Sequence, residues 1–395
     1  MSDSEHDTRA AARAVALVFT STGVGWSTFA ARIPQVRDGL ELTSSGIGLV
    51  MLSVAAGSLV ALPTAGILVH RLGAARAITI MSRLYGLGMA IAAVGVGVGT
   101  TGRAGVGVAA AVVGLLTMGF GNGAWDVAMN VEASVFEQRT GRSIMARFHA
   151  GFSIGTVVGG LVGALMNLLD VPVAAHLLLV SVGIAGGVPR LTRSFLPAIG
   201  DQHDGAGTHD RFAAWKERRT LLIGLFVLTM AFTEGTGNDW LGVAAVDGYG
   251  ASNALGSLSY VAFVAAMTLG RWFGPPLLHR HGRVLVLRSC AAISLAGLLI
   301  TVTAPNIWVA LIGVVLWGTG ASLGFPVGMS AASDDPIHAA ARVSVVATIG
   351  YVAFLAGPPL IGVLADHVGI LRALTVTAGL LGVGLLAAGA TAPER

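Results

Sequence analysis

The sequence has few charged residues. Asp, Glu, Lys and Arg make up 11% of its 395 residues, against about a quarter in ordinary soluble proteins. Apolar residues make up 54%, and a soluble protein of this size could not cover its surface with so little charge. The composition therefore excludes a soluble enzyme or binding module and predicts an integral membrane protein.

Cysteine and the motifs of metal and nucleotide chemistry are nearly absent. The single cysteine, Cys290, excludes an intrachain disulfide. We find no metal-ligand cluster, phosphate-binding glycine loop or nucleotide motif in the sequence, so we predict no metal and no cofactor. The net charge of +4 comes from basic residues scattered between apolar runs, which argues against nucleic acid as a partner.

Long apolar runs, by contrast, fill the chain. A spanning helix needs about 20 mainly apolar residues, and we count twelve such runs. The sequence therefore predicts an all-α integral membrane protein with twelve transmembrane helices. The predicted bounds are Ala10–Ala31, Ser45–Val69, Ala77–Gly99, Ala104–Val135, Phe148–Leu169, Val171–Val188, Thr220–Val246, Leu255–Phe273, Val284–Ala304, Ile307–Ala332, Arg342–Ala365 and Leu371–Ala390.

One long polar stretch divides these runs into two sets of six. We predict an N-terminal half over residues 1–188, a cytoplasmic linker over 189–219 and a C-terminal half over 220–395. With the N-terminus in the cytoplasm, 20 Lys and Arg residues fall on the cytoplasmic side and 4 on the other side. The positive-inside rule then places both termini in the cytoplasm.

A short repeat relates the two halves. LVHRLG at 68–73 and LLHRHG at 277–282 stand 209 positions apart, after the second and eighth runs. In the same order, GVG at 23–25 matches GTG at 235–237, and GFGNG at 119–123 matches GFPVG at 324–328. These matches predict two parallel six-helix repeats. Secondary transporters are often built this way, with a solute site between the halves near the membrane midplane.

The segment GILVHRLGAAR at 66–76 resembles the loop between helices 2 and 3 of the major facilitator superfamily, Gly-x-x-x-Asp-Arg-x-Gly-Arg-Arg. His70 replaces the Asp that usually makes a gating salt bridge. The resemblance implies that this loop and its counterpart in the second repeat control gating. The residues concerned are Gly66, His70, Arg71, Gly73, Arg76, His279, Arg280 and Gly282.

Longer stretches are similar to a narrower branch of that family, the MosC-type permeases near the fucose permeases. They are NGAWDVAMNVEA, GRSIMARFHAGFSIG, GFPVGMSAASDDP and ARVSVVATIGYVAFLAGPPLIGVLAD. The resemblance implies a monomeric transporter, surrounded by lipid in the plasma membrane of a bacterium, that works by alternating access. It also implies a small polar solute such as a sugar, a polyol or an amino sugar.

A polar stripe in the fourth run is the first candidate site. Asn122, Asp126 and Asn130 follow one another at intervals of four residues, so they share one helix face. An ionisable group inside the bilayer is costly and usually functional. We therefore predict that Asp126 accepts a proton beside two amides that bind solute hydroxyls. A polar clamp between helices near the cytoplasmic end is the alternative.

Further solute contacts are predicted beside this stripe. Trp125 flanks it, and Thr22 and Trp26 of the first run would add a hydroxyl and an aromatic face suited to a sugar-like ligand. Against Thr22, hydroxyls in membrane helices usually bond their own backbone. Arg32, at the outer end of the same run, is explained by a side chain that snorkels towards water.

The seventh run carries the second candidate site. Glu234 lies near its middle, and Asn238 follows one turn later. Gly235 and Gly237 weaken the helix here, and helices broken near the midplane often form solute sites. We predict Glu234 as the preferred proton-coupling residue, ahead of Asp126, and Asn238 as a solute contact. The alternative is that Glu234 only pairs with an arginine. Protons are the predicted coupling ion, and sodium stays open.

The fifth run has a glycine stripe. Gly151, Gly155, Gly159 and Gly163 recur every four residues, which predicts a smooth face for close helix packing.

Other functions remain open at this point. The same fold could export a drug or metabolite in exchange for protons. A membrane enzyme with Asp126 and His149 as acid and base is a different class, but the paired halves and the lack of a polar catalytic loop argue against it. A non-transporting sensor that kept the fold is a further alternative.

Overall fold

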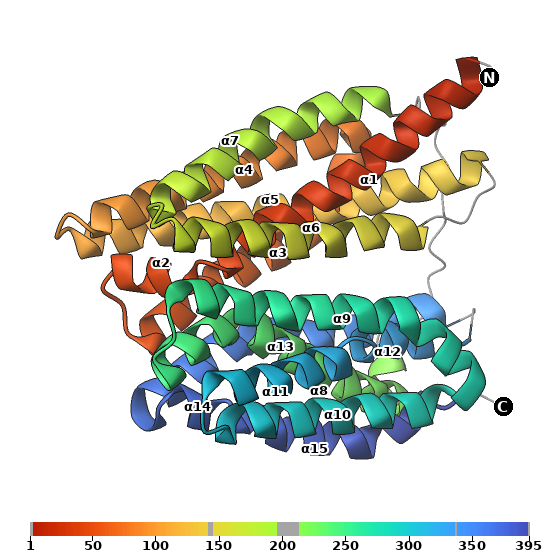
Figure 1. The fold of residues 1–395 in the computed structure, drawn as a ribbon. Coiled ribbons are helices and arrows are strands. Elements are labelled where there is room, and N and C mark those ends of the chain that lie inside the picture. The colour runs from red at the N-terminus through yellow and green to blue at the C-terminus, as the bar shows by residue number, and fades with distance from the viewer. Residues whose placement is uncertain (1–2, 141–144, 196–212, 336–337, 394–395) are drawn as a thin grey trace. The chain divides into compact units, whose positions relative to one another are not determined.

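The computed structural model describes residues 3–140, 145–195, 213–335 and 338–393. Throughout these residues the regular structure is helical, as predicted. The chain forms two compact units, residues 1–203 and 204–395, and each is a bundle of long helices (Figure 1). The predicted linker over 189–219 lies largely outside the described residues, although the helix before it continues to Leu191.

The described residues of the first unit form seven α-helices and one short 3₁₀ helix. They are α1 (Asp3–Ala30), α2 (Ile33–Gly39), α3 (Ser44–Leu72), α4 (Ala74–Gly99), α5 (Ala104–Thr140), α6 (Met145–Leu168), α7 (Val173–Leu191) and η1 (Thr192–Ser194).

In the second unit the first described element is a 3₁₀ helix, and the helices after it form a second bundle. Its elements are η2 (Ala213–Lys216), α8 (Arg218–Val243), η3 (Ala244–Gly248), α9 (Asn253–His281), α10 (Arg283–Thr303), α11 (Ile307–Ala321), α12 (Gly324–Ala332), α13 (Ala339–Val368), α14 (Ile370–Ala373), α15 (Thr375–Ala387) and η4 (Ala388–Thr391).

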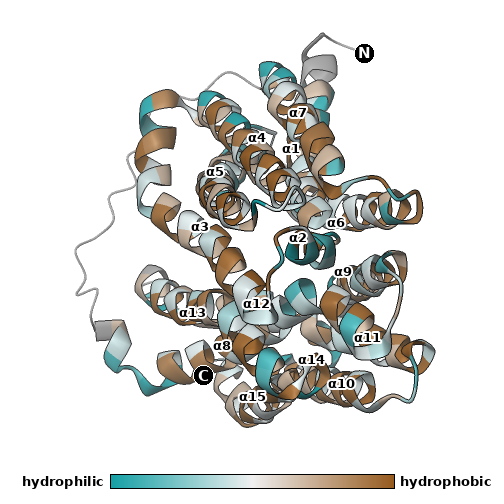
Figure 2. Ribbon diagram, turned by 90° about the vertical axis from the view of Figure 1, so that its left-hand side faces the viewer, coloured by the Kyte–Doolittle hydropathy of each residue, from teal (hydrophilic) through white to brown (hydrophobic). Residues whose placement is uncertain are grey.

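Among the described residues, eleven helices are long and apolar enough to cross a membrane, and the count reaches twelve if α1 and α2 form one span. Those two helices meet at a bend of 48°, and we did not predict the seven-residue α2. Figure 2 shows hydrophobic residues along the long helices of both units and hydrophilic ones mainly at helix ends. The twelve-helix fold predicted from the apolar runs is confirmed.

The two units repeat the same packing. In the first, α3 and α4 pack against α5, and α1 packs against α6. In the second, α9 and α10 pack against α11, and α8 packs against α13. Each of these contacts in one unit therefore has a counterpart between the equivalent helices of the other.

Close glycine contacts align the repeats residue by residue. A Cβ on Gly119 would meet the carbonyl oxygen of Val54, and one on Gly318 would meet that of Phe263. Val54 and Phe263 stand 209 positions apart, as the hexapeptides do, and Gly119 and Gly318 stand 199 apart. The counterpart of residues 119–123 is therefore GTGAS at 318–322. The predicted match to GFPVG at 324–328 was wrong by six residues.

The hexapeptides end two helices of 29 residues each. Gly73 caps α3 at a φ of 76°, and Gly282 caps α9 at a φ of 80°. Glycine occupies this left-handed region with little strain. The predicted spans ended too early, at Val69 and Phe273, because both helices continue up to these caps. His70, Arg71, His279 and Arg280 thus lie in last helical turns and not in loops.

Prolines are unevenly placed in the equivalent helices. Pro63 lies inside α3, whereas Pro275 and Pro276 both lie inside its counterpart α9. The pair Pro358 and Pro359 lies inside α13, and its counterpart α6 has no proline. Membrane helices tolerate such prolines because neighbouring groups bond the freed carbonyls.

Two interruptions differ from the prediction. We expected α8 to weaken at Gly235 and Gly237, but it is continuous from Arg218 to Val243. The break lies instead between α11 and α12, where Ser322 and Leu323 separate the two helices. Close packing against neighbouring helices keeps the glycine-containing part of α8 helical, because its residues 229–233 and 235–237 are buried.

Candidate functional site

The polar stripe of the first unit lies on α5. Asp126 is exposed, and Asn122 and Asn130 are half-buried. The Asn130 amide nitrogen donates to the Asp126 carbonyl oxygen at 2.9 Å, so its amide oxygen points away from its own helix. That oxygen lies 3.1 Å from Nε2 of His149 on α6. The stripe therefore presents a carboxyl group and two amides on α5, and the contact between Asn130 and His149 adds an imidazole from α6.

Phe19 of α1 positions the imidazole from the other side. Its ring meets the His149 ring edge-on at 5.1 Å between centroids, and Phe19 itself is fully buried. From the sequence, His149 was considered as a helix-end group that could titrate or steer solute, and as the acid or base of an enzyme, but not as part of the stripe. The structure makes it part of the stripe.

Two of the predicted solute contacts are buried. Trp125 is 0% exposed and packs edge-on against Tyr85. Thr22 is 2% exposed, and its hydroxyl donates to the Val18 carbonyl oxygen at 3.1 Å, as the backbone-bonding alternative anticipated. Neither side chain is presented to a solute, because helix packing covers the side of α5 and α1 on which it lies. Trp26 is half-buried and stays a candidate.

Arg32 is also placed differently from the prediction. Arg32 follows α1 in the turn before α2. It does not snorkel towards water, because it is only 2% exposed. Its Nη2 donates to the carbonyl oxygen of Val171 at 2.5 Å. The residue ties the first helix to the turn before α7.

In the second unit, Glu234 forms an ion pair. Nη2 of Arg271 on α9 donates to both carboxylate oxygens of Glu234 on α8, at 2.9 and 3.0 Å. The Nε of Arg271 donates to the carbonyl oxygen of Ser322 at 3.1 Å. The side chains of Glu234 and Arg271 are 15% and 30% exposed, so neither is fully buried. One arginine thus connects α8, α9 and the α11–α12 break.

From the sequence, an arginine partner for Glu234 was only the alternative prediction, and the arginine was not identified. Arg271 interrupts the apolar stretch AFVAAMTLGRWFG, and this is the signal that could have found it. We counted Arg271 instead with the basic residues of the cytoplasmic loop. Because it lies inside the apolar helix α9, the number of Lys and Arg residues on the cytoplasmic side should be one lower. Asn238 is half-buried one turn after Glu234, and Asp239 is buried.

The predicted gating residues flank the two glycine caps. His70, Arg71 and Arg76 are exposed around Gly73, and His279 and Arg280 are exposed before Gly282. A Cβ on Gly66 would meet no atom within 4 Å, so packing does not require this glycine.

The glycine stripe of α6 lies against α1. A Cβ on Gly151 would lie 3.0 Å from the Ala16 carbonyl oxygen, and one on Gly163 would lie 2.7 Å from the Ala31 side chain. Cβ atoms on Gly155 and Gly159 would overlap Thr20 and Ser27 of α1 in the same way.

A charge cluster that we did not predict ties the helix ends of the second unit. Asp334, after α12, accepts from Nη2 of Arg219 at 2.9 Å and from Nη1 of Arg283 at 2.9 and 3.0 Å. The stretch SDDP at 333–336 was noted in the sequence only as part of a motif that resembles the family. Its partners are far away in sequence, so no local pattern identifies them.

A second ion pair lies beside this cluster. Arg342 of α13 donates through Nε to Glu217 at 2.6 Å, and Glu217 also accepts from the Thr220 hydroxyl at 2.8 Å. Partial burial alone would raise the pKa of Glu217, but the two hydrogen bonds and the charge of Arg342 lower it below its usual value.

Within the described parts of the chain, no group of three or more His, Cys, Asp or Glu side chains could hold a metal ion.

Comparisons with known proteins identify the family. The model of the Major Facilitator Superfamily matches residues 15–358. An uncharacterised MFS-type transporter of Yersinia pestis is 30% identical over 95% of this chain and 93% of its own length. The membrane protein MosC of Rhizobium meliloti is 26% identical over 95% of this chain and 88% of its own length, in agreement with the branch suggested by the sequence.

Solved structures agree in fold. A nucleoside transporter, NupG, aligns over 97% of this chain and 99% of its own, with a TM-score of 0.79 and 16% identity. The Escherichia coli fucose:proton symporter FucP aligns over 97% and 98%, with a TM-score of 0.63 and 18% identity. A D-xylose–proton symporter aligns over 96% and 97%, with a TM-score of 0.71 and 15% identity. The chain therefore belongs to the major facilitator superfamily of membrane transporters, which are not enzymes.

Proposed function

We propose that this protein couples the movement of a small polar solute to a proton gradient by alternating access. The observation that carries the proposal is the ion pair between Glu234 and Arg271, inside the membrane-spanning part of the second half. An ionisable side chain inside the bilayer costs free energy, and by default it marks a functional site. The fucose and xylose transporters that share the fold are proton symporters by name, which supports the same coupling here.

Protonation of Glu234 would change the second half in a defined way. A neutral carboxyl group attracts the guanidinium far less strongly, so Arg271 loses its counter-ion but keeps its hydrogen bond to the Ser322 carbonyl oxygen at 3.1 Å. The two protonation states then favour different contacts among α8, α9 and the α11–α12 break. A difference of this kind can bias a conformational equilibrium.

The first half would supply the solute contacts. Asn122, Asn130 and His149 offer donors and acceptors for hydroxyl groups, and Asp126 offers a charged acceptor beside them. Trp26 would give an apolar sugar face something to pack against. A sugar, a polyol or an amino sugar has this combination of groups. Asp126 is also the second candidate for the proton carrier.

The test is transport by purified protein in liposomes. Glu234→Gln imitates the protonated acid and cannot release a proton, so uptake against a gradient should be lost. Exchange of solute across the membrane should continue, because it needs no net proton movement. Asp126→Asn tests the second candidate in the same way. Asp247→Asn, an exposed acid beyond the end of α8, is the control and should transport normally.

The outcome of this assay is decisive for the acids. If both Glu234→Gln and Asp126→Asn still concentrate solute under an imposed pH gradient, neither residue carries the proton. The sign of the movement also separates import from the alternative function, because an exporter would expel solute as protons enter. A screen of sugars, polyols and antibiotics by thermal shift would supply the solute for the assay.

The orientation is part of the proposal. We infer that both termini lie in the cytoplasm and that the protein is a monomer in a bacterial plasma membrane. Cysteines at the exposed positions Arg193 and Thr101, in a Cys290→Ser background, test this topology. An impermeant thiol reagent should label only Thr101→Cys in intact cells, and the reverse pattern would overturn the orientation.

A further inference from the structure

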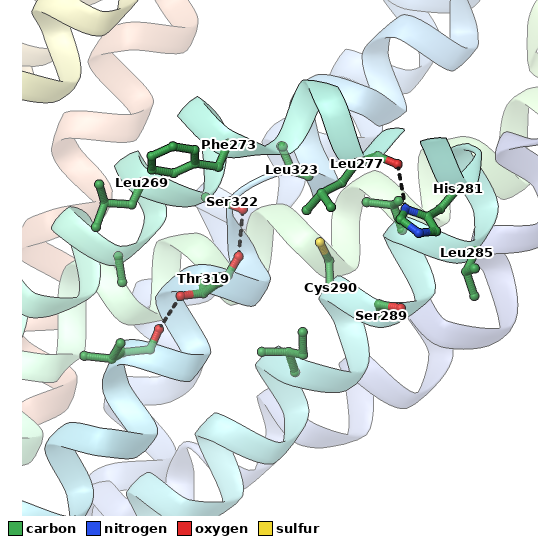
Figure 3. Close-up of a pocket in the computed structure, with 16 residues that line it drawn as sticks. Leu269, Phe273, Leu277, His281, Leu285, Ser289, Cys290, Thr319, Ser322 and Leu323 are labelled. Atoms are coloured by element: carbon green, nitrogen blue, oxygen red, sulfur yellow. Dashed lines mark hydrogen bonds between the residues drawn. The ribbon is translucent and has the colours of Figure 1, made fainter. Parts of the chain in front are cut away.

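The second unit contains an apolar pocket on the outside of α9, α10 and α11. It encloses about 530 Å³. Figure 3 shows Leu269 and Phe273 at one end and His281 at the other, with Cys290 and Ser289 between them. Phe273 is 63% exposed and Leu269 is 58% exposed, so the pocket is open along its apolar side.

Three residues that line this pocket differ in size from their counterparts in the first repeat. The counterparts of Ser289 and Cys290, 209 positions earlier, are Ile80 and Met81. The counterpart of Thr319, 199 positions earlier, is Phe120. This alignment follows from packing, because a Cβ on Gly121 would lie 2.9 Å from the Met81 carbonyl oxygen and one on Gly320 would meet the Cys290 carbonyl oxygen.

Three small side chains thus stand where the first half has three large ones. The backbone contacts around them are kept, so the helices of the second half have not closed up to fill the volume. The pocket is open to one side and its lining is mostly apolar, so an apolar occupant fits it.

The charges at one end indicate what kind of occupant fits. His281 lines the pocket, and Arg280 is exposed three residues after the lining residue Leu277, on the same face of α9. A basic group at the end of a membrane helix attracts anionic lipid headgroups. The apolar part beyond it offers an acyl chain contact with exposed side chains on three helices.

We propose that this pocket binds one acyl chain of an anionic phospholipid, with the headgroup at Arg280 and His281. The Glu234–Arg271 pair is not part of the site. The proposal therefore stands or falls separately from proton coupling.

The experiment uses substitutions that the first half itself supplies. Ser289→Ile, Cys290→Met and Thr319→Phe together fill the pocket with the side chains of Ile80, Met81 and Phe120. Purified protein is stripped of lipid, mixed with phosphatidylglycerol or phosphatidylcholine, and examined by native mass spectrometry. The wild type should retain one phosphatidylglycerol, and the filled variant should retain it roughly tenfold less well, because the buried acyl surface is lost.

Controls separate the pocket from general lipid contact. Ala292→Ile adds a side chain at an exposed position of α10 outside the pocket and should leave lipid retention unchanged. Arg280→Gln should reduce the preference for phosphatidylglycerol over phosphatidylcholine. Ser289→Ile alone, also at an exposed position, provides the test if the triple variant does not fold.

Labelling of the single cysteine gives an independent measurement. An apolar maleimide should reach Cys290 in lipid-free protein and react more slowly after phosphatidylglycerol is added, in the wild type but not in Ser289→Ile. The proposal is overturned if the filled variants retain phosphatidylglycerol as the wild type does. It is also overturned if Arg280→Gln leaves the lipid preference unchanged, or if a transported solute and not lipid protects Cys290.

Discussion

The two halves share a packing plan but differ in the chemistry it supports. In the first half, Asp126 is exposed and the nearby Asn130 is hydrogen-bonded to His149. In the second half, the acid is held by a guanidinium, because Arg271 donates to both oxygens of Glu234. The glycine contacts at Gly119 and Gly318 are the same in both halves. Backbone packing is therefore the part that duplication kept, and the polar side chains are the part that diverged.

Under the proposed function, this difference gives the halves separate tasks. A stripe of amides and an imidazole offers neutral hydrogen bonds, which suit solute hydroxyls. An ion pair between helices links the packing of α8 and α9 to the charge on Glu234. We expect that substitutions at shared packing positions will affect both halves equally, whereas substitutions at the polar groups will not.

The largest effect is expected at the shared glycines. Gly119→Ala and Gly318→Ala each place a Cβ against a backbone carbonyl oxygen, of Val54 and of Phe263. Because a backbone atom cannot move aside as a flexible side chain does, each variant should lose about 3 kcal/mol of stability. Thermal unfolding in detergent measures the loss.

Matched controls exist in both halves. Gly183 of α7 and Gly379 of α15 have no atom within 4 Å of an added Cβ, so alanine there should leave stability unchanged or raise it by up to about 1 kcal/mol. A penalty at Gly119 without a similar one at Gly318 would contradict the equivalence of the two packing plans.

The next effect is expected at the ion pair. Arg271→Met leaves the Glu234 carboxylate without its partner, and both side chains are partly exposed, at 30% and 15%. We expect a loss of about 2 kcal/mol, below the value for a fully buried pair. Adding Glu234→Gln should restore most of it. In the first half, Asp126→Asn breaks no described ion pair and should cost under about 0.5 kcal/mol. Equal losses in the two halves would remove the distinction drawn above.

A smaller effect is expected at the amide–imidazole contact. Asn130→Ala removes the acceptor that lies 3.1 Å from His149, and one hydrogen bond contributes about 1 kcal/mol. A double-mutant cycle with His149→Ala isolates this contact, and a coupling near zero would show that the two side chains act independently.

The smallest effect is expected outside the membrane, at Glu217. Its pKa is lowered below 4.5 in the folded protein, so its ion pair stabilises the fold above that pH and the contribution is lost as the pH falls through the lowered pKa. The melting temperature of Glu217→Gln should therefore fall less steeply below about pH 4.5 than that of the wild type. Parallel curves would mean that the pair contributes nothing measurable.

The sequence predicts the spans well and their interruptions poorly. Twelve apolar runs are visible because a membrane helix needs about 20 residues of one character. The seven-residue α2 is too short to give such a signal. The break at Ser322 also escaped notice, since small residues on both sides of it are common in continuous membrane helices.

Predicting the site from sequence fails where a contact joins distant residues. The spacing of Asn122, Asp126 and Asn130 was visible because it lies on one helix. The partner of Glu234 is 37 residues away, at Arg271, and its identity depends on how α8 and α9 pack. Helical spacing also left Trp125 and Thr22 as candidates, because it does not say which side of a face the neighbouring helices cover.

The prolines give the two halves different mechanical properties. Each proline inside a helix removes one backbone hydrogen bond and so lowers the energy needed to bend the helix at that point. The pairs at 275–276 and 358–359 soften α9 and α13, whereas their counterparts α3 and α6 have only Pro63 between them. In a cycle that requires these helices to flex, α9 and α13 would bend more easily than α3 and α6.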